Sequence, residues 1–178
     1  MAYQVIKYPI EKTAFYKMLC DQLAIYTANA PTAMAALANA SAVMSVALRD
    51  INWVGFYHVH EEQLVLGPFQ GQPAVMTIPF GQGVCGAAWQ TRQAQVVHDV
   101  HCFVGHIACD CSSSAEIVVP VLDAGGRVLG VIDIDSPQVG RFDDEDAAGL
   151  QMVAEVLSPF MMCIPSFFAV EIPQPIYL

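Results

Sequence analysis

The feature that most constrains the fold is a pair of apolar runs, residues 116–122 and 128–134, separated by the turn Ala124-Gly125-Gly126-Arg127. Apolar runs joined by a short glycine-containing turn are typical of a β-hairpin, because glycine readily adopts the backbone conformations that tight turns require. The first run is apolar at nearly every position, which indicates a buried strand. The chain is therefore expected to fold around an antiparallel sheet.

The remaining segments divide into strand-like and helix-like patterns. Strands are expected at residues 52–60, 63–69, 74–78 and 95–100, and helices at 13–28, at 31–49 with Pro31 in the first turn, through 86–89, and at 143–157. This order predicts an α+β fold, with an antiparallel sheet of about six strands and helices packed mainly on one side.

Length and composition indicate one domain with a substantial core, since the chain has 178 residues of which 55% are hydrophobic. We expect this domain to span residues 1–157. The segment that follows, residues 158–178, contains Pro159, Pro165, Pro173 and Pro175. Because proline interrupts helices, this tail is expected to be extended and docked on the domain.

The charge balance excludes two classes of partner. Acidic residues outnumber basic ones by 17 to 7, giving a formal net charge of −10 at pH 7. Binding to nucleic acid or to an anionic membrane surface requires clustered cations, whereas the basic residues are scattered, so neither partner is expected. The N-terminus lacks the pattern of a signal peptide, and the apolar part of the tail is too short to span a bilayer.

Six cysteines, at positions 20, 85, 102, 109, 111 and 163, would form a disulfide framework only in a small secreted protein. In a core-forming chain without a signal peptide they are expected to be reduced, and a disulfide among them to be catalytic. This cysteine usage favours a cytoplasmic location.

The loop before residue 116 carries the densest reactive chemistry. It holds the thiols of Cys109 and Cys111 beside His106 and Asp110. Cysteine reactivity depends on the thiolate fraction, and polar, partly exposed surroundings are where thiol pKa values change. The loop therefore predicts redox or nucleophilic chemistry.

Cys85 is a second candidate, because it lies where a glycine turn leads into a helix. A helix N-terminus lowers the pKa of a thiol. The alternative is that Cys85 is a small buried residue at a tight turn.

Zinc binding is the competing use of the histidines and cysteines at positions 98, 101, 102, 106, 109 and 111. These residues lack a paired C-x2-C motif, and Cys109-Asp110-Cys111 is too tight for a usual structural site. No metal and no cofactor is expected.

Asp133 and Asp135 form a third candidate cluster, at the end of a predicted strand. Alternation places both side chains on one face of the sheet, where buried carboxylates are costly unless they are paired or functional. With Glu116 they would form an acidic pocket for a ligand's ammonium group, or would hold one carboxyl of raised pKa that donates a proton. The alternative is that the two aspartates cap the following turn.

Taken together, these residues resemble the free methionine-R-sulfoxide reductases, single-domain enzymes of the GAF fold. The resemblance covers roughly residues 50 to 157. It rests on the strings Asn52-Trp53-Val54-Gly55-Phe56-Tyr57, Leu66-Gly67-Pro68-Phe69-Gln70-Gly71, Gly81-Gln82-Gly83-Val84-Cys85-Gly86, Gly105-His106-Ile107-Ala108-Cys109-Asp110, Ser114-Ala115-Glu116-Ile117-Val118 and Asp133-Ile134-Asp135-Ser136-Pro137.

The resemblance implies a role for each matching residue. Cys109 matches the catalytic cysteine and Cys85 the resolving one. The substrate-pocket acids are matched by Glu116, Asp133 and Asp135, and the pocket aromatics by Trp53 and Tyr57.

The implied chemistry is reduction of free L-methionine-(R)-sulfoxide. The Cys109 thiolate would attack the sulfoxide sulfur while a carboxyl protonates the departing oxygen. The resulting sulfenic acid would condense with a second thiol to a disulfide, which a thioredoxin-like reductant reduces. The resemblance also implies a homodimer.

The chain departs from the family at one cysteine. A third family cysteine follows the Gly-Pro-Phe-Gln-Gly string, where this chain has Val75. Cys102 and Cys111 lie outside the family pattern and are alternative resolving thiols. The competing hypothesis is a stand-alone GAF sensor that binds a small ligand in the same pocket and performs no catalysis.

Overall fold

The computed structural model describes residues 6–105 and 112–164. The helices are α1 (Lys12–Thr27), α2 (Ala33–Ala47), α3 (Gly83–Thr91) and α4 (Asp144–Met162), and a short 3₁₀ turn, η1, spans Val100–Cys102. The strands are β1 (Trp53–His60), β2 (Gln63–Gln70), β3 (Thr77–Pro79), β4 (Gln95–Val97), β5 (Ala115–Leu122) and β6 (Val128–Ser136).

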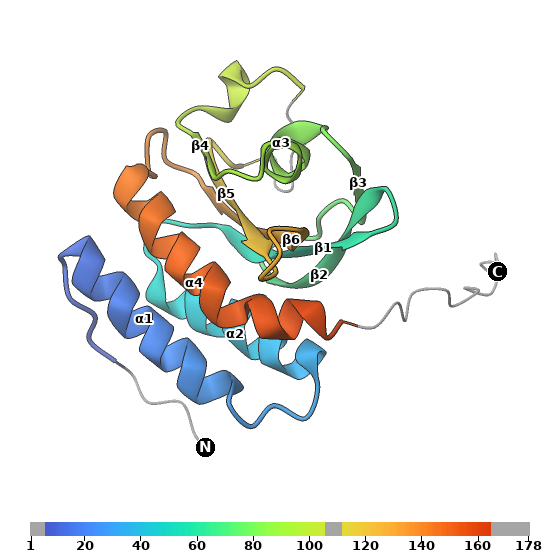
Figure 1. Cartoon of the computed structure of the whole chain (residues 1–178). Helices are drawn as coiled ribbons and strands as arrows, with labels where there is room; N and C mark the ends of the chain where they lie inside the picture. The colour runs from blue at the N-terminus through green and yellow to red at the C-terminus, as the bar shows by residue number, and fades with distance from the viewer. Residues whose placement is uncertain (1–5, 106–111, 165–178) are drawn as a thin grey trace, which may run out of the picture.

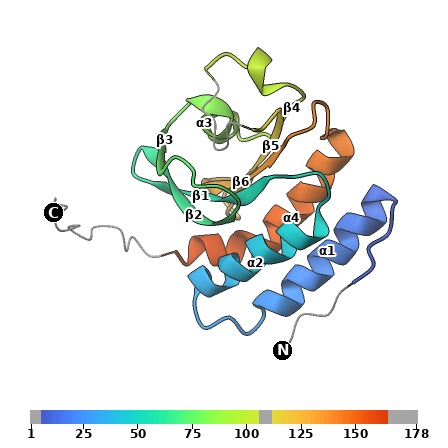
Figure 2. The same ribbon diagram turned by 180° about the vertical axis from the view of Figure 1, so that it is seen from behind.

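The strands form one antiparallel sheet in the order β3-β2-β1-β6-β5-β4. Helices α1, α2 and α4 cover one face, and α3 lies on the other (Figures 1 and 2). The predicted α+β class, the order of the elements and the placement of helices mainly on one side are confirmed. Among the described residues, no helix combines the length and the apolar character that crossing a bilayer requires.

The hairpin between β5 and β6 forms at the predicted turn. The Asp123 carboxylate accepts hydrogen bonds from the backbone N–H groups of Gly125 and Arg127, each at 2.9 Å. Gly126 has a φ of +78°, a conformation that costs glycine little. The turn therefore fixes the register that pairs β5 with β6 at the centre of the fold.

The main core lies between the sheet and the three-helix layer. Alternate residues of β1, β5 and β6, such as Phe56, Ile117 and Ile132, point into it and are fully buried. Each such side chain contributes about 1.5–3 kcal/mol by leaving water. The residues between them, which include Val118 and Val131, point to the other face of the sheet and pack with α3 in a second, smaller core.

The segment after Leu157 differs from the prediction. Helix α4 continues through Pro159 to Met162, so the expectation of an extended tail is wrong for residues 158–162. The helix persists because Leu157 and Met161 both pack in the main core, which outweighs the hydrogen bond that proline cannot donate. The rest of the tail, residues 165–178, lies outside the described residues.

Three other element boundaries differ from the prediction. Pro31 precedes the N-cap of α2, Thr32, whose hydroxyl accepts a hydrogen bond from Ala35 N. Residues 74–76 lie outside the short strand β3, and β4 ends at Val97 instead of Val100.

Candidate active site

The sheet face beneath α3 carries the acidic side chains. In the register of the sheet, Asp135 of β6 lies between Trp53 of β1 and Glu116 of β5. Two residues earlier on β6, Asp133 lies between Gly55 of β1 and Val118 of β5. Because side chains alternate across a strand, these positions all project toward α3.

The three carboxyl groups are buried, with relative exposures of 2% for Glu116, 0% for Asp133 and 1% for Asp135. The turn that follows is capped by a neighbour, since Ser136 Oγ accepts a hydrogen bond from Gln138 N at 3.0 Å. Buried acids on a sheet face are expensive, which favours the functional interpretation of Asp133 and Asp135 over turn capping.

Helix α3 brings the buried residue Cys85 to this acidic face. Cys85 is the third residue of α3, at the positive end of the helix dipole. Its Sγ and one carboxylate oxygen each from Glu116 and Asp133 all lie within 4.8 Å of one another. The structure thus assembles one thiol and two carboxyl groups, from α3, β5 and β6, in a buried cluster.

Burial raises the pKa of the Glu116 carboxyl well above its ordinary value. The negative charge of Asp135 acts in the same direction, and a hydrogen bond with Asp133 opposes the shift. Glu116 therefore retains its proton as the pH rises through the ordinary range of a glutamate carboxyl.

Aromatic rings form the wall beside the carboxyl groups. Trp53 stacks on Phe69, with ring centroids 5.3 Å apart, and on Tyr57 at 6.1 Å. A Cβ on Gly55 would lie 2.5 Å from the Trp53 ring, and a Cβ on Gly71 would lie 2.4 Å from it. Glycine at both positions lets the indole lie across the strands.

Backbone carbonyls of residues 71–76 hold these rings in place. Trp53 Nε1 donates to Gln72 O at 3.1 Å, and Tyr57 Oη donates to Val75 O at 3.0 Å. Sequence reasoning did not find these contacts, because a carbonyl acceptor has no side-chain signature. The segment containing Val75 serves here to position the aromatic wall.

The remaining cysteines are dispersed. Cys102 is exposed on η1. Cys20 lies on α1, on the other side of the sheet, where burial raises its pKa to about 11, and Cys163 is exposed at the end of α4. The predicted nucleophile Cys109 and the alternative thiol Cys111 lie outside the described residues.

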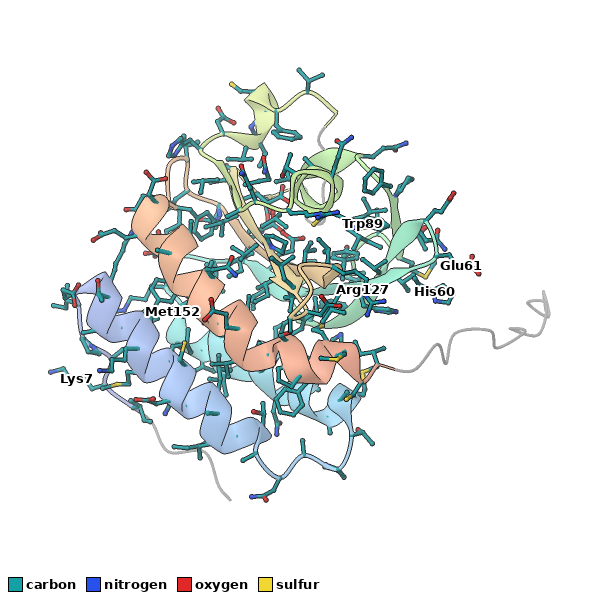
Figure 3. The ribbon with its side chains drawn as sticks, viewed as in Figure 1. Lys7, His60, Glu61, Trp89, Arg127 and Met152 are labelled. Carbon is teal, nitrogen blue, oxygen red and sulfur yellow. The ribbon has the colours of Figure 1, made fainter. Side chains whose placement is uncertain are left out.

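Two hollows lie away from this cluster. One, of about 590 Å³, is lined by the segment before α1 and by Lys12, Arg49 and Arg141. The other, of about 360 Å³, lies beside Trp89 of α3 and Arg127 of the β5–β6 turn, both labelled in Figure 3. Neither lining contains a cysteine.

The fold and this site define a GAF domain, since residues 36–161 match the model of the GAF domain family. More narrowly, the chain belongs to the family of free methionine-R-sulfoxide reductases. It is 48% identical to the Escherichia coli free methionine-R-sulfoxide reductase, over 83% of this chain and 89% of that protein. The yeast (Saccharomyces cerevisiae) enzyme of that name is 45% identical, over 68% of this chain and 72% of its own length.

A solved structure supports the same assignment. It is the free methionine-R-sulfoxide reductase from Neisseria meningitidis in complex with its substrate. That protein superimposes with a TM-score of 0.82 at 40% identity, over 89% of this chain and 96% of its own.

Proposed function

We propose that this protein is an oxidoreductase that reduces free L-methionine-(R)-sulfoxide to L-methionine. The observation that carries the proposal is the buried cluster of Cys85, Glu116 and Asp133, whose ligand atoms lie within 4.8 Å of one another. Relatives at 45% and 48% identity that are named for this activity support it.

Substrate binding is assigned to the acidic face and its aromatic wall. Asp135 and Asp133 attract the ammonium group of the free amino acid, an interaction strengthened by burial. Trp53 and Tyr57 supply apolar ring surface for the methyl group. A methionine inside a peptide chain has no such ammonium group, which gives a physical basis for selecting the free amino acid.

The reductive step uses a thiolate and a proton. The Cys109 thiolate attacks the sulfoxide sulfur, and the oxygen, protonated by a carboxyl group, is transferred to Cys109 as methionine departs. Glu116 is the proposed donor because its raised pKa keeps it protonated. General acid catalysis of this kind contributes about 10²–10⁴-fold.

The enzyme then returns to its reduced form in two steps. The Cys85 thiol condenses with the Cys109 sulfenic acid, forming a disulfide and releasing water. A thioredoxin-like dithiol reduces that disulfide by thiol exchange and is itself oxidised. Cys102 and Cys111 stand as alternative resolving thiols. We further propose a homodimer working in the cytoplasm, where such reductants keep thiols reduced.

The proposal is tested by measuring methionine formed from three substrates with dithiothreitol as reductant. The substrates are free L-methionine-(R)-sulfoxide, its S epimer and a peptide-bound sulfoxide. Turnover of the free R form alone, abolished in Cys109→Ser, is the expected result. Failure of the folded, reduced wild type to convert any of them would leave the sensor hypothesis.

A further inference from the structure

We propose that the reduced site binds Zn²⁺ through Cys85, Glu116 and Asp133, and that this ion acts as an inhibitor instead of a cofactor. The metal site itself depends only on the geometry of these three side chains. Its inhibitory effect rests on the proposed function, because the ion would occupy the carboxyl groups assigned to substrate.

The donor set matches the chemistry of zinc. Zn²⁺ takes thiolate sulfur at about 2.3 Å and carboxylate oxygen at about 2.0–2.2 Å, in tetrahedral geometry. These bond lengths place neighbouring donor atoms about 3.4–3.6 Å apart. The three donor atoms here lie within 4.8 Å of one another, so small side-chain rotations bring them to that spacing.

The scaffold holds the donors in place. Cys85 is on α3, Glu116 on β5 and Asp133 on β6, and β5 and β6 are paired along their whole length. All three residues are at most 2% exposed, so a bound ion would be largely shielded from water. Metal sites on rigid elements are more accurately formed than sites on loops.

Electrostatics favour a cation at this position. Two carboxyl groups and a thiol, with Asp135 adjacent to Glu116 on the neighbouring strand, would carry several negative charges once deprotonated. A divalent ion compensates these charges in a buried setting, where charge is costly. The positive end of α3 opposes the ion weakly, but it also favours the thiolate form that zinc requires.

Three protein donors leave one tetrahedral position for water or another ligand. Sites with such an open position are typical of exchangeable or catalytic zinc, whereas structural sites are closed by four protein donors. Binding displaces the proton of the Cys85 thiol and that of the Glu116 carboxyl, and no electrons are transferred. The ion therefore blocks the thiol and the acids together.

The test is direct titration of the reduced protein, without substrate and without dithiothreitol, which chelates zinc. Isothermal titration calorimetry with Zn²⁺ and ultraviolet absorption with Cd²⁺, whose thiolate complexes absorb, report binding independently of turnover. We expect one ion per protomer, a Cd²⁺–thiolate band, and heats that vary with the buffer because protons are released. Cys85→Ser should abolish the band, and Glu116→Gln should weaken Zn²⁺ binding about tenfold or more.

Matched controls separate this site from other thiols. Cys20→Ser and Cys163→Ser, which lie outside the cluster, should bind as the wild type does, with circular dichroism verifying that every variant is folded. Unchanged affinity in both Cys85→Ser and Glu116→Gln, or no binding by the wild type, would overturn the inference. If the protein binds zinc but the zinc-free, reduced protein does not turn over the sulfoxide, the proposed function is contradicted. Turnover by a protein that does not bind zinc would contradict only this inference.

Discussion

At the scale of single residues, the site combines one thiol with three buried acids. Asp133 and Asp135 are expected on one face from strand alternation alone, because the side-chain period of two is a property of the backbone. The contact of Cys85 with Asp133 and Glu116 was not predictable in this way. It depends on where α3 packs against the sheet, and no local signal near Cys85, Glu116 or Asp133 encodes that placement.

Glu116 should make stability depend on pH. The pKa of the Glu116 carboxyl is raised in the folded state. Its contribution to the free energy of unfolding is therefore fully present below the pKa of the unfolded chain, and it is lost as the pH rises through the folded-state pKa. Each pKa unit between the folded and the unfolded state corresponds to about 1.4 kcal/mol of stability. Glu116→Gln, which cannot ionise, should therefore gain stability relative to wild type as the pH rises above the ordinary glutamate value of 4.5.

Urea unfolding at a series of pH values measures this difference. Glu155→Gln, at an exposed position on α4, is the control and should follow the wild-type pH dependence. A gap between Glu116→Gln and wild type that stays constant across the series would argue against a raised pKa.

Gly55 should be required for the aromatic wall. A Cβ there would lie 2.4 Å from Phe69 Cβ and 2.5 Å from the Trp53 ring. Gly55→Ala should therefore destabilise the fold by about 1–3 kcal/mol and raise the KM for the sulfoxide. At Gly125, where the nearest atom is a side-chain oxygen at 3.3 Å, the same change should do neither. Wild-type KM and stability in Gly55→Ala would mean that Trp53 can relocate at no cost.

At the scale of elements, local signals predict where most helices and strands occur, but tertiary packing decides where several of them end. Proline chemistry predicts a stop before Pro159, yet burial of Leu157 and Met161 carries α4 to Met162. The apolar pattern of residues 74–76 suggests a strand, whereas the carbonyl of Val75 there accepts a hydrogen bond from Tyr57 Oη. In both places, long-range contacts outweigh local propensity.

The α1–α4 contact is fixed by a buried charge. Asp146, whose side chain is 2% exposed, accepts from Tyr16 Oη at 2.8 Å and pairs with Lys12 Nζ at 2.7 Å and Arg141 at 3.4 Å. It also accepts from the backbone N–H of Asp143, completing a capping box. These contacts join the start of α4 to α1 on the face of the sheet away from the candidate site.

Asp146→Ala should be destabilising, by about 1–3 kcal/mol, because it leaves the buried Tyr16 hydroxyl without its acceptor and removes one partner each from Lys12 and Arg141. Chemical denaturation measures the loss, and kcat/KM at a temperature where the variant remains folded should match wild type. Asp144→Ala, at an exposed position in the same turn that makes none of these contacts, should cost little. A specific loss of activity in folded Asp146→Ala would mean that the two faces are coupled.

At the scale of the whole molecule, the sheet separates two tasks. The three-helix layer (Figure 2) and the main core stabilise one face of the sheet. The other face, under α3, carries the acids, the thiol and the aromatic rings. This division lets a costly group of buried carboxyl groups persist, because the larger core supplies the stability that the site lacks.

The most direct test of this account is a single turnover without reductant. Fully reduced protein is mixed with free L-methionine-(R)-sulfoxide, and methionine is quantified together with the disulfide-linked peptides by mass spectrometry. For the wild type we predict one methionine per protomer and a Cys85–Cys109 disulfide. Cys85→Ser should still form methionine, but without that disulfide. No methionine, or a disulfide that joins Cys109 only to Cys102 or Cys111, would contradict the assignment of the buried cluster under α3 as the resolving half of the active site.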